Sequence, residues 1–190
     1  MHETGLGLRL HDRVYGSDSW SVFTRWYQGI LPDAVVRFDD RVERVVMYRD
    51  IDLSIDQAPA LAAPSALSVQ YLLPFDPDTA RDIWSAYTER FLVDGPEGTY
   101  VRLTPETDVE DIRTTCLSTW LAREIGDDEL FQRLLEWVDN HYEPRVDDDR
   151  GEFGYWFGLD EPFPRGQWNN VVMNAFVAPP GTWTSLFADD

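Results

Sequence analysis

Apolar side chains recur along the chain mainly at helical spacing, in segments that glycine and proline separate. Residues 6–15 predict the end of an apolar helix that Gly16 closes. Residues 17–30 predict a second helix, with Ser17 as its N-cap and Pro32 as its stop. The chain therefore opens with a predicted pair of helices.

Two kinds of predicted helix alternate in the rest of the chain. Residues 57–73 are rich in alanine and leucine and almost free of charge, which is typical of a buried helix. Pro64 must then lie in the first turn of this helix or bend it. Residues 78–91 carry apolar side chains on one face only, as an outer amphipathic helix does. Further apolar or amphipathic helices are expected at residues 108–125, 127–138 and 168–176.

Short extended segments follow the amphipathic helices. The β-prone runs at 34–48 and 145–157 surround acidic turns and predict two short β-hairpins, and residues 99–103 predict one short strand. The order of buried helix, amphipathic helix and extended segment occurs three times, which predicts an all-α (α/α) toroid or barrel. Three such units make about half of a toroid. We therefore expect a single domain over residues 1–190, an incomplete barrel without its N-terminal half, with an irregular tail at 178–190.

The charge of the chain limits its partners. Arginine and lysine together number 16, all of them arginine, against 35 acidic residues, which gives a net charge of −19. Such a chain repels phosphate, so neither nucleic acid nor an anionic membrane is an expected partner. The lysine-free, aspartate-rich composition is typical of a halophile, and the alternative is an ordinary acidic protein from a bacterium with a GC-rich genome. The sequence has no 18-residue apolar run and no signal peptide, which predicts a cytoplasmic protein.

Three segments together resemble the linalool dehydratase/isomerase family. The run TTCLSTWLAREIGDDELFQRLLEWV at 114–138 is similar to that family's joint between an inner and an outer helix. LPFDPDTARDIWSAYTERF and RLHDRVYGSDSWSVFTRWYQGIL resemble two earlier helix pairs of the family. The resemblance covers most of residues 6–138 and is weaker from residue 144 onward.

The resemblance implies an (α/α)6 barrel and a cofactor-free lyase/isomerase. Such enzymes interconvert linalool with myrcene by loss of water and with geraniol by hydroxyl migration, using acid–base groups and a cysteine at an apolar barrel mouth. The family's two active-site cysteines precede the segment that corresponds to residues 6–15. Its pocket tyrosine and tryptophan correspond here to Ala63 and Leu67. The resemblance therefore implies no catalytic residue in this chain, which is expected to be inactive alone or completed by another chain.

Other residues with chemical potential have simpler interpretations. Cys116 has no histidine near it in sequence, so it is expected to be a small core residue rather than a nucleophile. His2, His11 and His141 lack metal-ligand spacing and are expected at the surface. The acidic turn at 147–152 places its glycine one position too early for a calcium loop, so it is expected to be a solvated turn. No metal or cofactor is expected.

The candidate substrate contacts lie where the last strand turn meets the last inner helix, at the expected cavity mouth. They are Tyr155, Trp156, Trp168 and Asn169. The alternative for them is packing of the barrel end. The expected ligand is a small apolar alcohol or a sugar.

Two other function classes stay open at this stage. A carbohydrate-active or carbohydrate-binding toroid could use Asp147 and Glu152 as a carboxylate pair, although chance pairs are common at this charge density. A non-catalytic interaction domain, which supports a partner or a second copy of the chain, is the third possibility.

Overall fold

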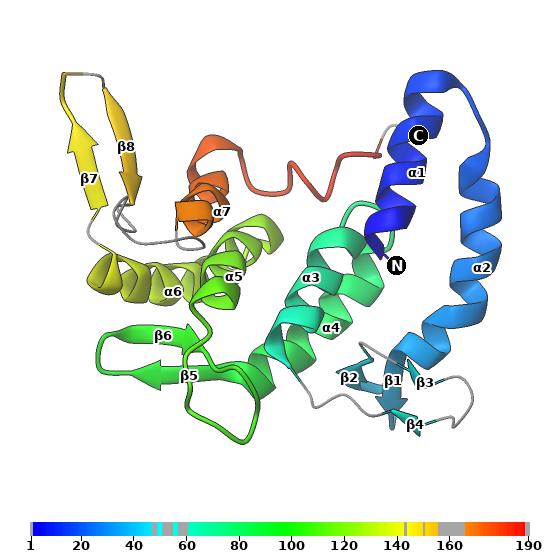
Figure 1. Cartoon of the computed structure of the whole chain (residues 1–190), viewed down its shortest axis with the longest axis horizontal. Coiled ribbons are helices and arrows are strands. Elements are labelled where there is room, and N and C mark those ends of the chain that lie inside the picture. The colour runs from blue at the N-terminus through cyan, green and yellow to red at the C-terminus, as the bar shows by residue number, and fades with distance from the viewer. Residues whose placement is uncertain are drawn as a thin grey trace. The chain divides into compact units, whose positions relative to one another are not determined.

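The computed structural model of the chain describes residues 2–46, 49–50, 55–56, 61–142, 144–149, 151–155 and 166–188. The fold is mostly helical, with short antiparallel strand pairs, as the sequence predicts (Figure 1). The chain divides into two compact units. One is Met1–Arg90 together with Phe187–Asp190, and the other is Phe91–Leu186.

A pair of helices followed by a β-hairpin occurs three times along the chain (Figure 1). The first set is α1 (His2–Tyr15), α2 (Ser19–Ala34), β1 (Val35–Phe38) and β2 (Arg41–Val45). The second is α3 (Ala62–Leu72), α4 (Pro77–Phe91), β5 (Leu92–Gly95) and β6 (Gly98–Val101). The third is α5 (Ile112–Ile125), α6 (Asp128–His141), β7 (Pro144–Asp147) and β8 (Glu152–Tyr155). A short pair, β3 (Arg49–Asp50) and β4 (Ile55–Asp56), precedes the second set, and α7 (Gly166–Val177) follows the third.

The expected hairpins at 34–48 and 145–157 are present as β1–β2 and β7–β8. The strand expected at 99–103 is present as β6, but its partner β5 is not predicted, and the two strands form a further antiparallel hairpin. This hairpin packs against α6 at Gly98, where φ is +114° and an added Cβ would lie 2.5 Å from the backbone nitrogen of Trp137. A second link is the ion pair between Arg133 and Asp94, at 2.6 Å. Tertiary packing therefore stabilises strand residues that local pattern alone does not reveal.

Aromatic packing joins α1 and α2 in the first unit. Gly5 lies so close to Phe23 that an added Cβ would overlap the ring, so the two helices approach through this glycine. Phe23 and Tyr27 are buried on one face of α2, and both rings contact Phe75, with centroids 6.0 and 5.7 Å apart. The apolar face of α2 thus closes the core of this unit.

Both ends of α2 differ from expectation. Asp18, rather than Ser17, occupies the N-cap position, and the Ser17 hydroxyl donates instead to a carboxylate oxygen of Asp12 at 2.5 Å. Pro32 does not stop the helix, which continues to Ala34. Proline removes only its own N–H from the ladder, and the N–H of Val35 still donates to the carbonyl of Leu31, so the last turn survives.

An aspartate stabilises the start of the second helix in each pair. Asp12 accepts from the N–H of Trp20 at 2.6 Å, and Asp76 accepts from the N–H of Thr79 at 3.2 Å. Asp127 accepts from the N–H of Leu130 at 3.1 Å. Each carboxylate satisfies a helix-start donor that has no partner inside the helix. The three pairs therefore share one kind of joint as well as one order of elements.

The second unit is built around α5. This helix begins at Ile112 rather than at 108, because Asp111 caps it by accepting from the N–H of Thr114, and it ends at Gly126 with φ +88°. Ten of its fourteen residues are buried, as expected for an inner helix. A core cluster combines it with α6, β8 and α7, and consists of Cys116, Trp137, Val138, Tyr142, Tyr155 and Val172.

The incomplete barrel expected from the sequence would leave its inner helices uncovered on one side, and this expectation is only partly correct. An incomplete barrel would leave six apolar residues near solvent, namely Leu61, Leu67, Val69, Leu72, Trp120 and Phe176. Leu67 and Phe176 are exposed, by 42% and 46%, and Leu61 is half-buried. Val69, Leu72 and Trp120 are buried, so their expected exposure is wrong. Within the first unit α1 packs against α3, and within the second the indole of Trp183 lies against that of Trp120.

Candidate functional site

Of the four predicted substrate contacts, the structure describes the side chain of Tyr155 alone. Tyr155 is 5% exposed, and its hydroxyl donates to a carboxylate oxygen of Asp139 at 2.6 Å. Burial and this carboxylate raise the pKa of the phenol well above its usual range. Trp156 lies outside the described residues. Trp168 and Asn169 lie in α7, but their side chains are not among those that the structure describes. The four-residue contact set therefore stays a prediction.

The thiol of Cys116 is placed for packing rather than for attack. Its side chain is fully buried in the core cluster of the second unit. Burial, with a smaller contribution from the charge of Asp111, raises the pKa of the thiol to about 12. Nucleophilic cysteines need the opposite, a low pKa and access to substrate. The interpretation of Cys116 as a core residue agrees with this environment.

The described histidines make structural contacts. His11 is exposed, and its Nδ1 lies 2.9 Å from the Ser17 hydroxyl oxygen. His141 stacks on Trp137 with ring centroids 3.9 Å apart, and its Nε2 lies 3.4 Å from a carboxylate oxygen of Glu97. The side chain of His2 lies outside the described part. Within that part, no group of three or more histidine, cysteine, aspartate or glutamate side chains is arranged to hold a metal ion.

The acidic run at 147–152 forms the end of the β7–β8 hairpin. Asp148 and Asp149 are exposed in its turn, and Gly151 has φ +66°. Asp147 and Glu152 are paired in register across the two strands. Their side chains are not among those that the structure describes, so a carboxylate pair at these two positions stays a prediction.

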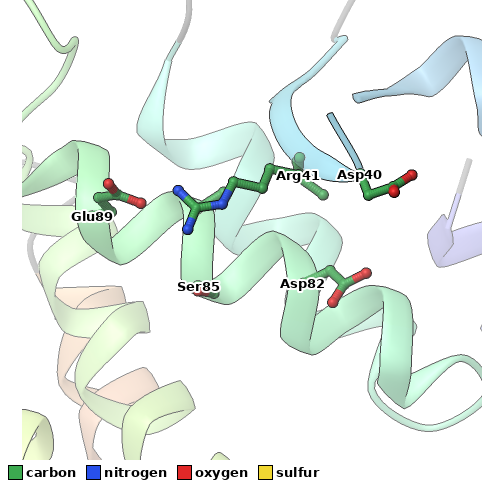
Figure 2. Close-up of a pocket in the computed structure, with 7 residues that line it drawn as sticks. Asp40, Arg41, Asp82, Ser85 and Glu89 are labelled. Atoms are coloured by element: carbon green, nitrogen blue, oxygen red, sulfur yellow. The ribbon is translucent and has the colours of Figure 1, made fainter. Parts of the chain in front are cut away.

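A small polar pocket lies between the β1–β2 turn and α4. Its volume is about 180 Å³, and Figure 2 shows the Arg41 side chain reaching across α4 near Ser85 and Glu89. The adjacent Arg37 bonds to Asp82 at 2.8 Å and fastens the hairpin to the helix. Ligand pockets usually enclose about 300 Å³ or more and are mostly apolar. We therefore interpret this pocket as the seam between hairpin and helix.

The most suggestive surface is an incompletely covered side of α3. Residues on the other sides of this helix are buried, namely Ala62, Ser65, Ala66, Ser68, Val69 and Leu72. On the remaining side Ala63, Gln70 and Tyr71 are half-buried, and Leu67 is exposed. Their spacing of three and four places them along one side of the helix, which we call the α3 stripe. A helix with almost no charge thus keeps one apolar side open.

Polar groups lie at the C-terminal end of the α3 stripe. Burial and the negative charge of Glu3 on α1 raise the pKa of the Tyr71 phenol. A phenol with a raised pKa stays protonated at neutral pH and can donate a hydrogen bond, while a carboxylate can accept one. An apolar wall that ends in a donor and an acceptor suits a small hydrocarbon that carries a hydroxyl group.

The comparison with protein families decides which protein group this is. Residues 3–153 match the family model described as linalool dehydratase/isomerase. The chain belongs to the linalool dehydratase/isomerase family. No curated protein matches the chain. The family match spans all three helix pairs and the three sequence segments that carried the resemblance.

In this linalool dehydratase/isomerase family member, one candidate site lies inside the matched range and the other lies outside it. Glu3 and the α3 stripe lie inside it, whereas Tyr155, Trp156, Trp168 and Asn169 lie beyond residue 153. The sequence identifies Ala63 and Leu67 only as departures from the family and does not point to Gln70 or Tyr71. The signal that could have found them is their spacing, since Gln70 and Tyr71 follow Leu67 by three and four positions and so share its side of the helix.

The described helices give no indication of a membrane span. Among them, none combines the length and the apolar character needed to cross a bilayer.

Proposed function

We propose that this chain is a linalool dehydratase/isomerase-like domain that forms part of an (α/α) barrel and holds a small terpene-like alcohol along the α3 stripe. The barrel proposal is supported by the three sets of helix pair and hairpin, by their shared aspartate joints and by the family match. A nearly charge-free α3 and a largely buried α5 supply the kind of helix that lines a toroid from inside.

The observation that carries the ligand proposal is Leu67. It is the one large apolar side chain of α3 that is exposed, and it lies in line with the Tyr71 phenol. A terpene-like alcohol would place its hydrocarbon on Leu67 and Ala63 and its hydroxyl near Tyr71. Burying apolar surface supplies affinity, and the hydroxyl contact supplies orientation.

We also infer that the chain alone does not convert the alcohol. The resemblance implies a reaction that uses accessible acid–base groups and a cysteine, but the cysteine in this sequence is buried with a pKa raised to about 12. At the family's pocket tyrosine and tryptophan positions the chain carries Ala63 and Leu67, which cannot transfer a proton. Binding without turnover is therefore the expected behaviour of this chain.

The experiment measures binding and turnover on the purified chain. Linalool is titrated against the chain while nuclear magnetic resonance shifts report binding, and gas chromatography follows myrcene and geraniol. Leu67→Lys should weaken linalool binding about tenfold or more, because a buried leucine contributes roughly 1.5–3 kcal/mol. The control is Val22→Lys, which changes an exposed apolar residue on a different helix, α2. This variant should bind linalool as wild type does.

Three results would contradict parts of this proposal. Absence of linalool binding, or binding that Leu67→Lys leaves unchanged, removes the α3 stripe as the site. Conversion of linalool that a substitution within the chain abolishes removes the inference of inactivity. Saturable binding of cellobiose that Asp147→Asn or Glu152→Gln weakens would favour the carbohydrate alternative.

A further inference from the structure

The segment after α7 forms an ordered series of turns. The N–H of Ser185 donates to the carbonyl of Gly181 at 2.9 Å, and the N–H and hydroxyl of Thr182 both donate to the carbonyl of Pro179, at 3.2 and 2.7 Å. Gly181 has φ +79°, a conformation that glycine adopts without strain. We call residues 179–186 the strap. The strap lies beyond the range that matches the family.

A buried carboxylate on α5 fastens the strap. Glu124 is 5% exposed, and its Oε1 accepts two hydrogen bonds from Thr184, from the N–H at 2.7 Å and from the hydroxyl at 2.9 Å. Its backbone carbonyl accepts a third, from the N–H of Gly181 at 3.1 Å. Hydrogen bonds to an ionised acceptor are stronger than neutral ones. These three bonds therefore hold the strap to the C-terminal turn of α5.

An aromatic contact lies one helical turn earlier. The indoles of Trp120 and Trp183 meet edge to face, with centroids 6.1 Å apart and planes at 64°. Trp120 is 7% exposed, so this side of α5 is covered. Edge-to-face aromatic pairs add a modest attraction to the burial of their area. The strap thus has one polar and one apolar attachment, on residues four apart on the same helix face.

We propose that residues 179–186 act as a releasable strap, which closes over α5 and whose opening presents the Glu124 carboxylate beside the Trp120 indole. The strap is a short series of turns outside the helices, so it can open while the helices stay folded. A carboxylate cannot stay buried without its hydrogen bonds, so release must bring Glu124 to solvent or to a polar ligand. The proposal depends only on α5 and the strap and is independent of the α3 stripe.

Hydrogen–deuterium exchange on the intact chain tests the attachment. Glu124→Gln removes the charge of the acceptor, and Thr184→Val removes the hydroxyl donor. In both variants amides at 181–186 should exchange about tenfold faster than in wild type, because bonds to charged groups contribute on that scale. Thr182→Val is the matched control, because its hydroxyl bonds within the strap and not to α5. Amides of α5 should keep their wild-type exchange in all three variants.

Two exchange results would overturn the proposal. One is strap exchange that stays at the wild-type rate in both Glu124→Gln and Thr184→Val. The other is equal acceleration in the strap and in α5, because the segment would then open only when the helix itself unfolds.

Carbodiimide-driven amidation of carboxylates provides the second readout. Glu124 should resist labelling in wild type and become labelled several-fold faster in Thr184→Val, while the exposed Glu129 on α6 is labelled equally in both. Labelling of Glu124 in wild type at the rate of Glu129 would show that nothing covers it. Equal protection of Glu124 in wild type and in Thr184→Val would equally reject a releasable strap.

Discussion

The hydroxyl of Ser17 donates to Oδ1 of Asp12 at 2.5 Å, and the other carboxylate oxygen of Asp12 accepts from the N–H of Trp20 at 2.6 Å. A residue of α1 thus supplies the cap of α2. Asp18, which occupies the N-cap position in place of the expected Ser17, makes no side-chain cap bond. One carboxylate therefore fixes both the turn between the helices and the start of the second helix.

Asp12→Ala should lower the Tm of the chain by a few degrees, because it removes both acceptors. Asp18→Ala, which deletes the same charge six residues away, should leave the Tm nearly unchanged. Thermal denaturation followed by circular dichroism measures both. Equal effects of the two substitutions would show that Asp12 acts only through its charge.

The Asp12 effect should depend on pH. The hydrogen bond from Ser17, followed by backbone N–H donors that include Trp20, holds the pKa of the Asp12 carboxyl below its usual range. A carboxyl whose pKa is lower in the folded than in the unfolded state stabilises the fold at pH values above the ordinary aspartate pKa. This contribution is lost as the pH falls toward the folded-state pKa. The Tm gap between wild type and Asp12→Ala should therefore be full at pH 7 and shrink below about pH 4. A gap that widens in acid would contradict this assignment.

Two glycines of α1 provide a matched pair of substitutions. An added methyl at Gly5 would overlap the ring of Phe23, whereas nothing lies within 4 Å of a Cβ built at Gly7. Gly5→Ala should destabilise the chain by about 1–3 kcal/mol through overpacking. Gly7→Ala should stabilise it by roughly 0.5–1 kcal/mol, because alanine is the better helix former. Urea denaturation of both variants tests this, and the same sign for both would disprove the close α1–α2 approach.

Local chemistry explains which elements could be predicted from the sequence. Gly126 and Asp127 mark the end of α5 and the start of α6 because the backbone conformation and the cap depend on those two residues themselves. Pro64 lies in the first turn of α3 for the same kind of reason. The β5 strand was missed because it follows α4 directly and depends on pairing with β6, which itself packs against α6. Such contacts between distant segments leave little trace in a local pattern.

The candidate sites were less predictable for a related reason. Residues 57–73 carry no charged side chain that would mark an outer face, so the sequence gives little indication of which side of α3 stays open, and the exposure of Leu67 depends on the packing of its neighbours. Glu124 beside Arg123 looks like an ordinary charged helix end. Its burial depends on Thr184, sixty residues later. Both features are consequences of tertiary structure.

Cys116 should be inert to thiol reagents in the folded chain. Its burial and a pKa raised to about 12 leave very little thiolate at pH 8, so Ellman's reagent should label it only after unfolding. The matched control is the same chain in guanidinium chloride, where labelling should be rapid and reach one thiol per chain. Labelling of the native chain at the rate of a free thiol would contradict the core placement.

Ionic strength should stabilise this chain, although salt has two opposing effects on it. The ion pairs Arg37–Asp82, Arg123–Asp128 and Arg133–Asp94 are partly exposed, and screening weakens such pairs, each of which contributes at most about 1 kcal/mol. Screening also weakens repulsion, and the excess of 35 acidic side chains over 16 arginines leaves a net charge of −19 whose self-repulsion opposes the compact state. The repulsive term should therefore dominate.

Raising KCl from 0.1 to 1 M shortens the Debye length from about 10 Å to about 3 Å, which is less than the spacing of most surface charges. The Tm should rise over this range by several degrees, and most steeply at its low end, because screening saturates. Sucrose of matched osmolality is the control, because it is excluded from the protein surface but does not screen charges. Its stabilising effect on the Tm should grow with concentration without saturating. A Tm that stays flat or falls in KCl would mean that the surface pairs outweigh the net charge of −19, and the halophilic interpretation of the composition would then be wrong.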